Sequence, residues 1–195
     1  MNSIDLTALV AARFRESAEL KLASVAALAP AIARAGDLLG DCLRGGGKLL
    51  VCGNGGSAAD AQHFTAELLG RYERERDGLP AIALHADTST LTAVSNDYGF
   101  EQVFARQVLA LGRPGDALVA ISTSGNSPGI LRAVEAAQRA GLAVVALTGR
   151  NGGALGASLR ATDVEIRVPA TVTARIQEVH ILALHCLCEL IDALP

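Results

Sequence analysis

Five short, mostly apolar runs, each followed by a loop and a segment with helical character, constrain the fold of this chain more than any other feature. The runs span residues 48–52, 81–84, 117–121, 143–147 and 163–168. Strands that are apolar along their length are buried on both faces, and their alternation with helices is typical of a parallel sheet. The sequence therefore predicts an α/β fold, a three-layer αβα sandwich around a five-stranded parallel sheet.

The segments outside these runs carry helical patterns. We expect two N-terminal helices over 6–28 and 30–45, joined at Pro30, because proline suits the first turn of a helix. Further helices are expected from the loop after the first run to about 72, then over 88–94, 101–111, 128–140 and 173–193, with a short one after 153. Without a linker or a repeat, the chain is expected to form a single domain over 1–195, with helices in 1–45 and the α/β core and C-terminal helix in 46–195.

The hydropathy of the chain is high for a soluble monomer. Half of the residues are hydrophobic, and the mean hydropathy is +0.33. No uninterrupted apolar run reaches the roughly 20 residues that a membrane-spanning helix needs. We therefore expect no membrane segment and attribute the excess to surface that is buried between subunits, which predicts an oligomer.

Charge and cysteine usage narrow the functional class. The net charge is −3 and basic residues do not cluster, which argues against a nucleic-acid-binding protein. The N-terminus lacks the basic and apolar regions of a signal peptide, so a cytoplasmic protein is expected. Cys42, Cys52, Cys186 and Cys188 lie in apolar surroundings without a Cys-x-x-Cys spacing, and we expect them to be reduced thiols.

Two polar loops follow the first and third runs. Ligands of open α/β sheets bind beyond the carboxyl ends of the strands, where both Gly53–Ser57 and Ser122–Ser127 are expected. The second loop offers hydroxyl groups and precedes a helix, whose free N–H groups and dipole favour an anion such as phosphate. The alternative is an ordinary turn and helix cap, for which serine and asparagine are also preferred.

The first loop, Gly53–Ser57, also matches the loose Gly-x-Gly-x-x-Gly/Ala pattern of dinucleotide-binding proteins when it is read on to Ala58. That match is weak, because the expected acidic residue at the end of the next strand has no good candidate. The loop has no lysine at its end, so it is not a P-loop. A nicotinamide cofactor is therefore disfavoured.

Four polar side chains on two helical segments form the second candidate site. His63 and Glu67 are four residues apart and share a helix face. Gln177 and His185 lie about two turns apart in an otherwise apolar helix, where buried polar groups need partners. Histidine and glutamate are ordinary zinc ligands, whereas glutamine is less usual. A metal site remains open beside two simpler readings, a surface pair at His63 and Glu67 and core histidines in the last helix.

Taken together, four segments resemble the phosphoheptose isomerase family of sugar-isomerase (SIS) domains. They are Gly53–Ser57, Ser95–Gly99, Ser122–Ser127 and Arg175–His180, in the family's order and spread over essentially the whole chain. The resemblance implies isomerisation of sedoheptulose 7-phosphate to D-glycero-D-manno-heptose 7-phosphate, the first step toward the ADP-heptose of bacterial lipopolysaccharide. It also implies a homotetramer whose sites are completed by neighbouring subunits.

The resemblance further implies roles for individual residues. One zinc ion per subunit would be bound by His63, Glu67, Gln177 and His185. From the chemistry of the implied ketose–aldose isomerisation, which needs a base near the carbon, we also expect Glu67 to be the catalytic base and His185 its partner on the sugar oxygens. The matching substrate-binding positions are Asn54, Gly55, Gly56, Ser57, Asn96, Asp97, Ser122, Thr123, Ser124, Ser127 and Gln177. The chain departs from the pattern at Ala174, where some members of the family carry an acidic residue.

A second reading comes from a different functional class. The chain also resembles a tetrameric adaptor that binds the replication initiator DnaA, a close relative of these isomerases. That adaptor lacks the carboxylate and histidine that correspond to Glu67 and His185, and protein binding needs neither. Because this chain has both residues, we favour the isomerase. A phosphosugar-sensing domain is a third, weaker reading, since no DNA-binding segment is attached.

Overall fold

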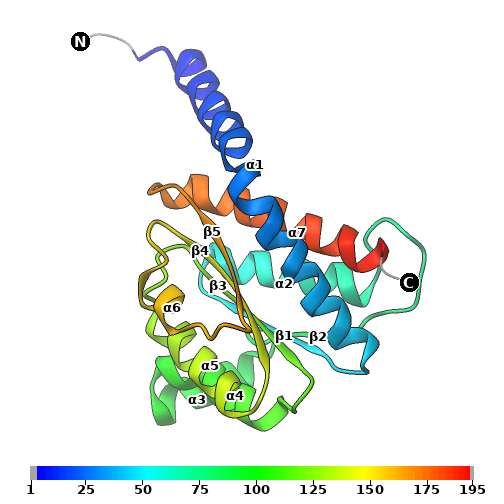
Figure 1. The fold of residues 1–195 in the computed structure, drawn as a ribbon. Helices are drawn as coiled ribbons and strands as arrows, with labels where there is room; N and C mark the ends of the chain where they lie inside the picture. The colour runs from blue at the N-terminus through cyan, green and yellow to red at the C-terminus, as the bar shows by residue number, and fades with distance from the viewer. Residues whose placement is uncertain (1–3, 194–195) are drawn as a thin grey trace.

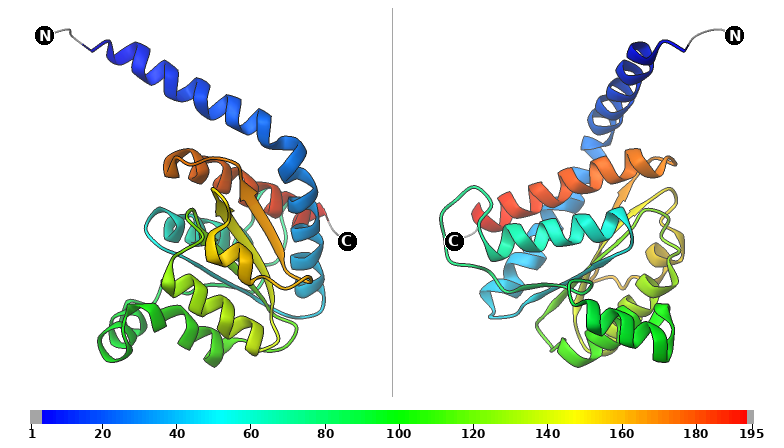
Figure 2. Two further views of the ribbon diagram at one scale, coloured as in Figure 1. Left: turned by 60° about the vertical axis from the view of Figure 1, so that its left-hand side comes forward. Right: turned by 180° about the vertical axis from the view of Figure 1, so that it is seen from behind.

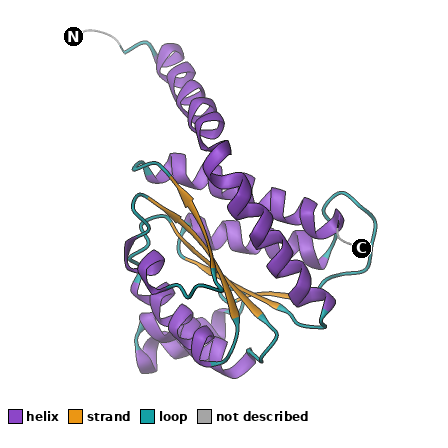
Figure 3. Cartoon of the chain, in the orientation of Figure 1, coloured by secondary structure: helices purple, strands orange, loops and turns teal. Residues whose placement is uncertain are grey.

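The computed structural model describes residues 4–193 and contains a five-stranded parallel sheet between two layers of helices (Figures 1 and 3). The strand order is β2-β1-β3-β4-β5. The strands are β1 (Leu49–Gly53), β2 (Ala81–Ala83), β3 (Ala117–Ser122), β4 (Ala143–Gly149) and β5 (Val164–Val168). The predicted α/β sandwich is therefore confirmed, with each strand within about two residues of its expected bounds.

The central strands are apolar because both of their faces are covered. Every residue of β1 and β3 is buried, and the two strands pair in parallel from Leu49 opposite Ala117 to Gly53 opposite Ile121. A strand with one solvated face would alternate polar and apolar residues. The continuous apolar runs thus follow directly from the double cover.

The helices divide between the two faces of the sheet. One layer holds α1 (Leu6–Arg44), α2 (Gly56–Leu69) and α7 (Thr173–Ala193). The other holds α3 (Thr88–Tyr98), α4 (Val103–Leu111), α5 (Pro128–Arg139) and α6 (Gly153–Ser158), with a 3-10 turn, η1 (Phe100–Gln102). Each layer closes its own hydrophobic core against the sheet. Helices α2 and α7, from distant parts of the sequence, lie against each other in one layer (Figure 2).

The N-terminal region contains one helix where the sequence predicted two. Helix α1 runs unbroken from Leu6 to Arg44 with Pro30 inside it. A proline removes one backbone hydrogen bond and bends a helix, and Figure 2 shows α1 changing direction partway along its length. The prediction of separate helices over 6–28 and 30–45 was wrong, because one lost bond within a 39-residue helix is outweighed by the packing of its second half.

The first half of α1 extends away from the sandwich (Figures 1 and 2). It exposes large apolar side chains, among them Leu6, Phe14 and Leu22, each at least 70% accessible. By length and composition α1 is also the one helix in residues 4–193 that could cross a membrane. This test admits up to two charged residues, whereas our expectation rested on the lack of an uninterrupted apolar run of about 20 residues. The finding is weak, because a core helix of a soluble protein passes the same test.

The cysteines agree with the expectation of reduced thiols. All four are free, and three of them, Cys42, Cys52 and Cys188, are buried. Burial raises the pKa of Cys52 to about 12, so this thiol stays protonated at neutral pH. A thiol without thiolate character is a poor nucleophile and a poor metal ligand.

Candidate functional site

The two polar loops meet at one edge of the sheet. Because β1 and β3 are parallel neighbours, the loops that follow them emerge side by side. The side-chain amide of Asn54 in the first loop donates a hydrogen bond of 2.8 Å to the hydroxyl of Ser127 in the second. The structure thus joins the loops that the sequence singled out, in the crevice where such sheets bind ligands.

The loop Ser122–Ser127 is held in shape by Gly125. Its φ is +65°, a left-handed conformation, and a Cβ atom there would lie 1.9 Å from the carbonyl oxygen of Gly152. The carbonyl of Gly125 accepts a hydrogen bond of 2.8 Å from the backbone N–H of Leu155 at the start of α6. Since only glycine fits both the angle and the space, the loop is fixed against its neighbour rather than free to rearrange.

The serines of this loop do not behave as a simple helix cap. Ser127 occupies the N-cap position of α5, yet its side chain makes no capping hydrogen bond and accepts the bond from Asn54 instead. The Ser124 hydroxyl accepts a 3.2 Å bond from the backbone N–H of Asn126. Ordinary capping therefore does not explain Ser127, which weakens the alternative reading of the loop.

Three of the four predicted metal-site residues lie near one another where α2 packs against α7. The Nε2 atoms of His63 on α2 and His185 on α7, 122 positions apart in the chain, lie 3.0 Å from each other. The nearer carboxylate oxygen of Glu67 lies 3.4 Å from His63 Nε2. The ring of Tyr72 stacks on His185, with centroids 5.8 Å apart. Glu67 is partly shielded, with 23% of its side chain accessible.

These side chains approach the spacing of a zinc site. Zinc bonds of about 2.0–2.1 Å in tetrahedral geometry place neighbouring ligand atoms about 3.3 Å apart. The 3.0 Å between the histidines and the 3.4 Å from His63 to Glu67 both agree with that value. Within residues 4–193, however, no three histidine, cysteine or acidic side chains already surround one point. The donor types, two imidazoles and a carboxylate, are nevertheless ordinary ligands of zinc.

Gln177 lies at the glycine-rich loop. A Cβ atom on Gly56 would be 2.4 Å from the side-chain nitrogen of Gln177, so the amide packs directly on the first turn of α2. This close approach requires glycine at position 56. Gln177 therefore adjoins the predicted substrate loop, whereas the structure gives no contact between its side chain and the histidine pair.

Asn96 and Asp97 are placed apart from the histidine pair. Both are exposed near the end of α3, and the Asn96 amide donates a 2.8 Å hydrogen bond to the Asp97 carboxylate. Helix α3 packs against α4 and η1, on the opposite face of the sheet from α2 and α7. Within one subunit, the structure does not bring these two residues together with Glu67 and His185.

His180, on the same helix as His185, has a structural role. It is fully buried, and its Nε2 is 2.9 Å from the backbone carbonyl oxygen of Thr148 at the end of β4. Burial lowers the pKa of this imidazole to about 4, so the ring is neutral and donates to that carbonyl. His180 fastens α7 to the sheet. The sequence did not distinguish this histidine from its neighbour, because both lie among apolar residues.

The buried state of His180 predicts a loss of stability in acid. The unfolded chain gains a proton near pH 6.5 and the folded chain only near pH 4, so between these values acid favours unfolding. From pH 7 to 5 the free energy of unfolding should fall by about 2 kcal/mol on this account. Urea unfolding of wild type and His180→Gln at pH 7 and pH 5 measures this fall, which should be smaller in the variant. The same pH dependence in both proteins would contradict the assignment.

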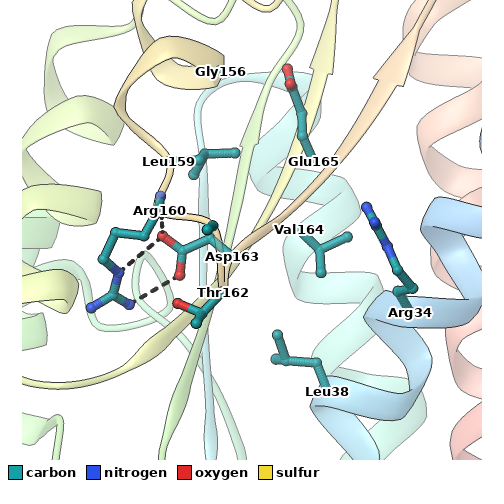
Figure 4. A pocket seen from close by; sticks show the side chains of 10 residues that line it. Arg34, Leu38, Gly156, Leu159, Arg160, Thr162, Asp163, Val164 and Glu165 are labelled. Carbon is teal, nitrogen blue, oxygen red and sulfur yellow. Dashed lines mark hydrogen bonds and ion pairs between the residues drawn. The ribbon is translucent and has the colours of Figure 1, made fainter.

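One cavity lies away from these residues. It has a volume of about 560 Å³ and lies between α1 and the segment that leads into β5 (Figure 4). Arg34 and Leu38 line one side, and Arg160 and Asp163 form an ion pair of 3.0 Å on the other. No predicted site residue lines this cavity, so the chemistry is better sought at the loops and the histidine pair.

Comparison with known proteins identifies the family of this chain. A family model described as the SIS domain matches residues 13–149. A phosphoheptose isomerase from Shewanella sp. (strain ANA-3) is 59% identical over 179 residues, which cover 92% of this chain and 91% of the relative.

Two solved structures extend the likeness to the fold. The phosphoheptose isomerase of Neisseria gonorrhoeae has a TM-score of 0.93 and 52% identity, over 97% of this chain and 100% of the other. A phosphoheptose isomerase from Francisella tularensis has a TM-score of 0.94 and 50% identity, over 97% and 99%. The chain belongs to the SIS-domain family and, within it, to the phosphoheptose isomerases, which are sugar-phosphate isomerases.

Proposed function

We propose that this protein converts sedoheptulose 7-phosphate to D-glycero-D-manno-heptose 7-phosphate, in the cytoplasm, as the first step toward the ADP-heptose of lipopolysaccharide. The observation that carries the proposal is the cluster of His63, Glu67 and His185. His63 and Glu67 lie on α2, the helix that begins at the first polar loop. The high identity to phosphoheptose isomerases supports this substrate.

The reaction moves a proton between two adjacent carbons through an enediol. It requires a base near the carbon and an acid near the oxygen. Glu67 is the proposed base, taking the proton from C1 and returning one to C2. His185 is the proposed partner, exchanging a proton with the sugar oxygens. The 3.0 Å contact with His63 and the stacked ring of Tyr72 hold the His185 imidazole in one orientation for that task.

The phosphate of the substrate is proposed to bind at Ser122–Ser127. The hydroxyls of Ser122, Thr123, Ser124 and Ser127 and the N-terminal end of α5 supply donors and a positive dipole end. Asn54, Gly55, Gly56, Ser57 and Gln177 would contact the sugar from the neighbouring loop. Binding energy at the remote phosphate then positions the reacting carbons at Glu67.

Zinc is the proposed cofactor, one ion per subunit. His63, Glu67 and His185 would hold it, and Gln177 would join them only after its side chain leaves Gly56. When bound, zinc supplies a Lewis acid that polarises the carbonyl of the sugar. A carboxylate bonded to zinc is a weaker base than a free one, so the proposed roles of Glu67 as zinc ligand and as base compete.

A homotetramer is proposed as the active form. The first half of α1 exposes apolar side chains; Phe14 is 75% accessible and Leu22 76%. Contact with a neighbouring subunit would bury them. Asn96 and Asp97, which lie away from His185 in one subunit, would reach a site of a neighbouring subunit. The assembly thus accounts for substrate-binding positions that a single chain leaves apart.

The competing role, an adaptor for the replication initiator DnaA, makes the opposite prediction for activity. Purified protein incubated with sedoheptulose 7-phosphate, with and without added zinc, should convert it to the heptose 7-phosphate, as followed by NMR of the sugar. A protein whose Ser127 and Glu67 serve only structure would leave the ketose unchanged. No conversion under either condition would refute the isomerase and favour the adaptor.

A further inference from the structure

A buried ion pair links the two helices that carry the candidate catalytic residues. The Nε of Arg76 donates a hydrogen bond of 2.6 Å to the carboxylate of Asp192. Arg76 lies in the loop between α2 and β2, and Asp192 lies in the last turn of α7. The two side chains are only 10% and 8% accessible. Figure 2 shows this loop passing the C-terminal end of α7.

The same guanidinium closes the C-terminal end of α2. Its Nη2 donates a hydrogen bond of 3.0 Å to the backbone carbonyl of Glu67. Its Nη1 donates one of 2.8 Å to the backbone carbonyl of Leu68. The last carbonyls of a helix have no partners within the helix, and a positive charge there also favours the helix dipole. Arg76 therefore holds the backbone of Glu67 itself, the proposed base, as well as the helix end.

Asp192 lies on the same face of α7 as His185. It follows His185 by seven residues, about two turns, so both lie on the face of α7 that is turned toward α2. Between them on the helix is Cys188, whose raised pKa of about 12 comes first from burial and then from the nearby charges of Glu67 and Asp192, with Arg76 opposing. These side chains thus share one buried interface.

Two polar contacts therefore fix α2 against α7. One is the 3.0 Å approach of His63 and His185, and the other is the Arg76–Asp192 pair. A buried ion pair is weak evidence for stability, because apolar residues of similar size often serve as well. One carboxylate oxygen of Asp192 also has no partner within the described residues. Net stability therefore does not explain the Arg76–Asp192 pair, which also leaves a polar atom unpaired, and a role in function is the better explanation.

We propose that the Arg76–Asp192 pair is a positioning clamp that sets the placement of Glu67 relative to His185. The inference rests on the proposed isomerase function, for which Glu67 and His185 are the acting groups. Neither Arg76 nor Asp192 touches the substrate. They act through the end of α2 and the register of α7, and a small shift of either helix would separate the base from its partner.

The deciding experiment removes both charges together. In Arg76→Met/Asp192→Leu no charge is left unpaired, but the carbonyls of Glu67 and Leu68 lose their donor, so the protein should stay folded with a modestly lower melting temperature. If the pair is a clamp, kcat should still fall about 10- to 100-fold, the cost typical of losing a group that orients an active side chain, while KM stays similar. Arg132→Gln/Glu135→Gln removes an exposed ion pair on α5 and should leave kcat unchanged.

Two further measurements test whether Arg76 and Asp192 position the catalytic side chains. If the double variant does not fold, Arg76→Lys retains the charge but cannot reach Asp192 and both carbonyls at once, and it should lower kcat in the same direction. The imidazole 15N NMR signals of His63 and His185, recorded without metal, should also shift in either variant, because their 3.0 Å contact changes.

The outcomes separate this inference from the proposed function. A folded variant with wild-type kcat overturns the clamp while the isomerase stands. A wild-type protein that does not convert the sugar refutes the isomerase, and the imidazole signals then decide alone. Signals identical in wild type and variant would mean that Arg76 and Asp192 do not position the pair.

Discussion

Glu67→Gln should lower kcat by about 100- to 10,000-fold, the usual cost of losing a positioned general base. The amide keeps the volume and the hydrogen-bonding capacity of the side chain but cannot accept a proton from carbon. The loss corresponds to about 3–5 kcal/mol in activation free energy. Because the side chain is 23% accessible and fills no core position, the melting temperature should change little. Steady-state kinetics with saturating zinc separates the loss of the base from any loss of metal.

The control for this variant is Glu135→Gln, on the exposed surface of α5, where the carboxylate only pairs with Arg132. It should retain wild-type kcat. His185→Asn should lose activity in the same way as Glu67→Gln, since its proposed partner role also needs a proton. Full turnover in both site variants would show that Glu67 and His185 are not the catalytic pair.

Zinc binding is expected to depend on the histidine pair. Protein purified without chelator should contain about one zinc per chain. His63→Ala and His185→Ala should each weaken zinc affinity by more than the roughly 10- to 100-fold that follows loss of a group which only orients a ligand. Competition with a chromogenic chelator measures the affinity without reference to activity.

His85→Ala is the matched control for the zinc measurement. His85 is partly buried and lies 3.4 Å from the Gln62 side chain, with its ring edge against Phe104 rather than at the histidine pair. Its removal should leave the zinc affinity unchanged. A wild-type protein that contains no zinc and stays fully active after chelation would leave His63 and His185 as hydrogen-bonding groups alone.

The boundaries of the core elements could be read from local sequence because local chemistry sets them. The helix from Thr173 to Ala193 has the bounds that its apolar pattern predicted, and β1 and β3 follow their apolar runs. The division at Pro30 could not be predicted correctly. A proline is locally unfavourable in a helix, and only the packing of the flanking segment on α7 and β5 decides that the helix continues.

The sequence by itself determined which residue types could do chemistry. The i, i+4 spacing of His63 and Glu67, and the polar residues in an apolar helix at Gln177 and His185, marked them as a set. It could not determine that His63 and His185 approach to 3.0 Å while Gln177 turns to Gly56. Those distances depend on how α2 and α7 pack, and the two helices are more than a hundred residues apart in the sequence.

The role of Arg76 also could not be predicted from the sequence. In the sequence it is one charged residue among several in a polar loop, and nothing nearby distinguishes it from Arg71 or Arg74. In the folded chain it alone of the three is bonded to the end of α2 and to Asp192, 116 positions away. Helical periodicity and strand hydrophobicity are local properties, so the sequence determined the elements. The partners of a buried charge are set by the packing of those elements, and only the tertiary structure decided them.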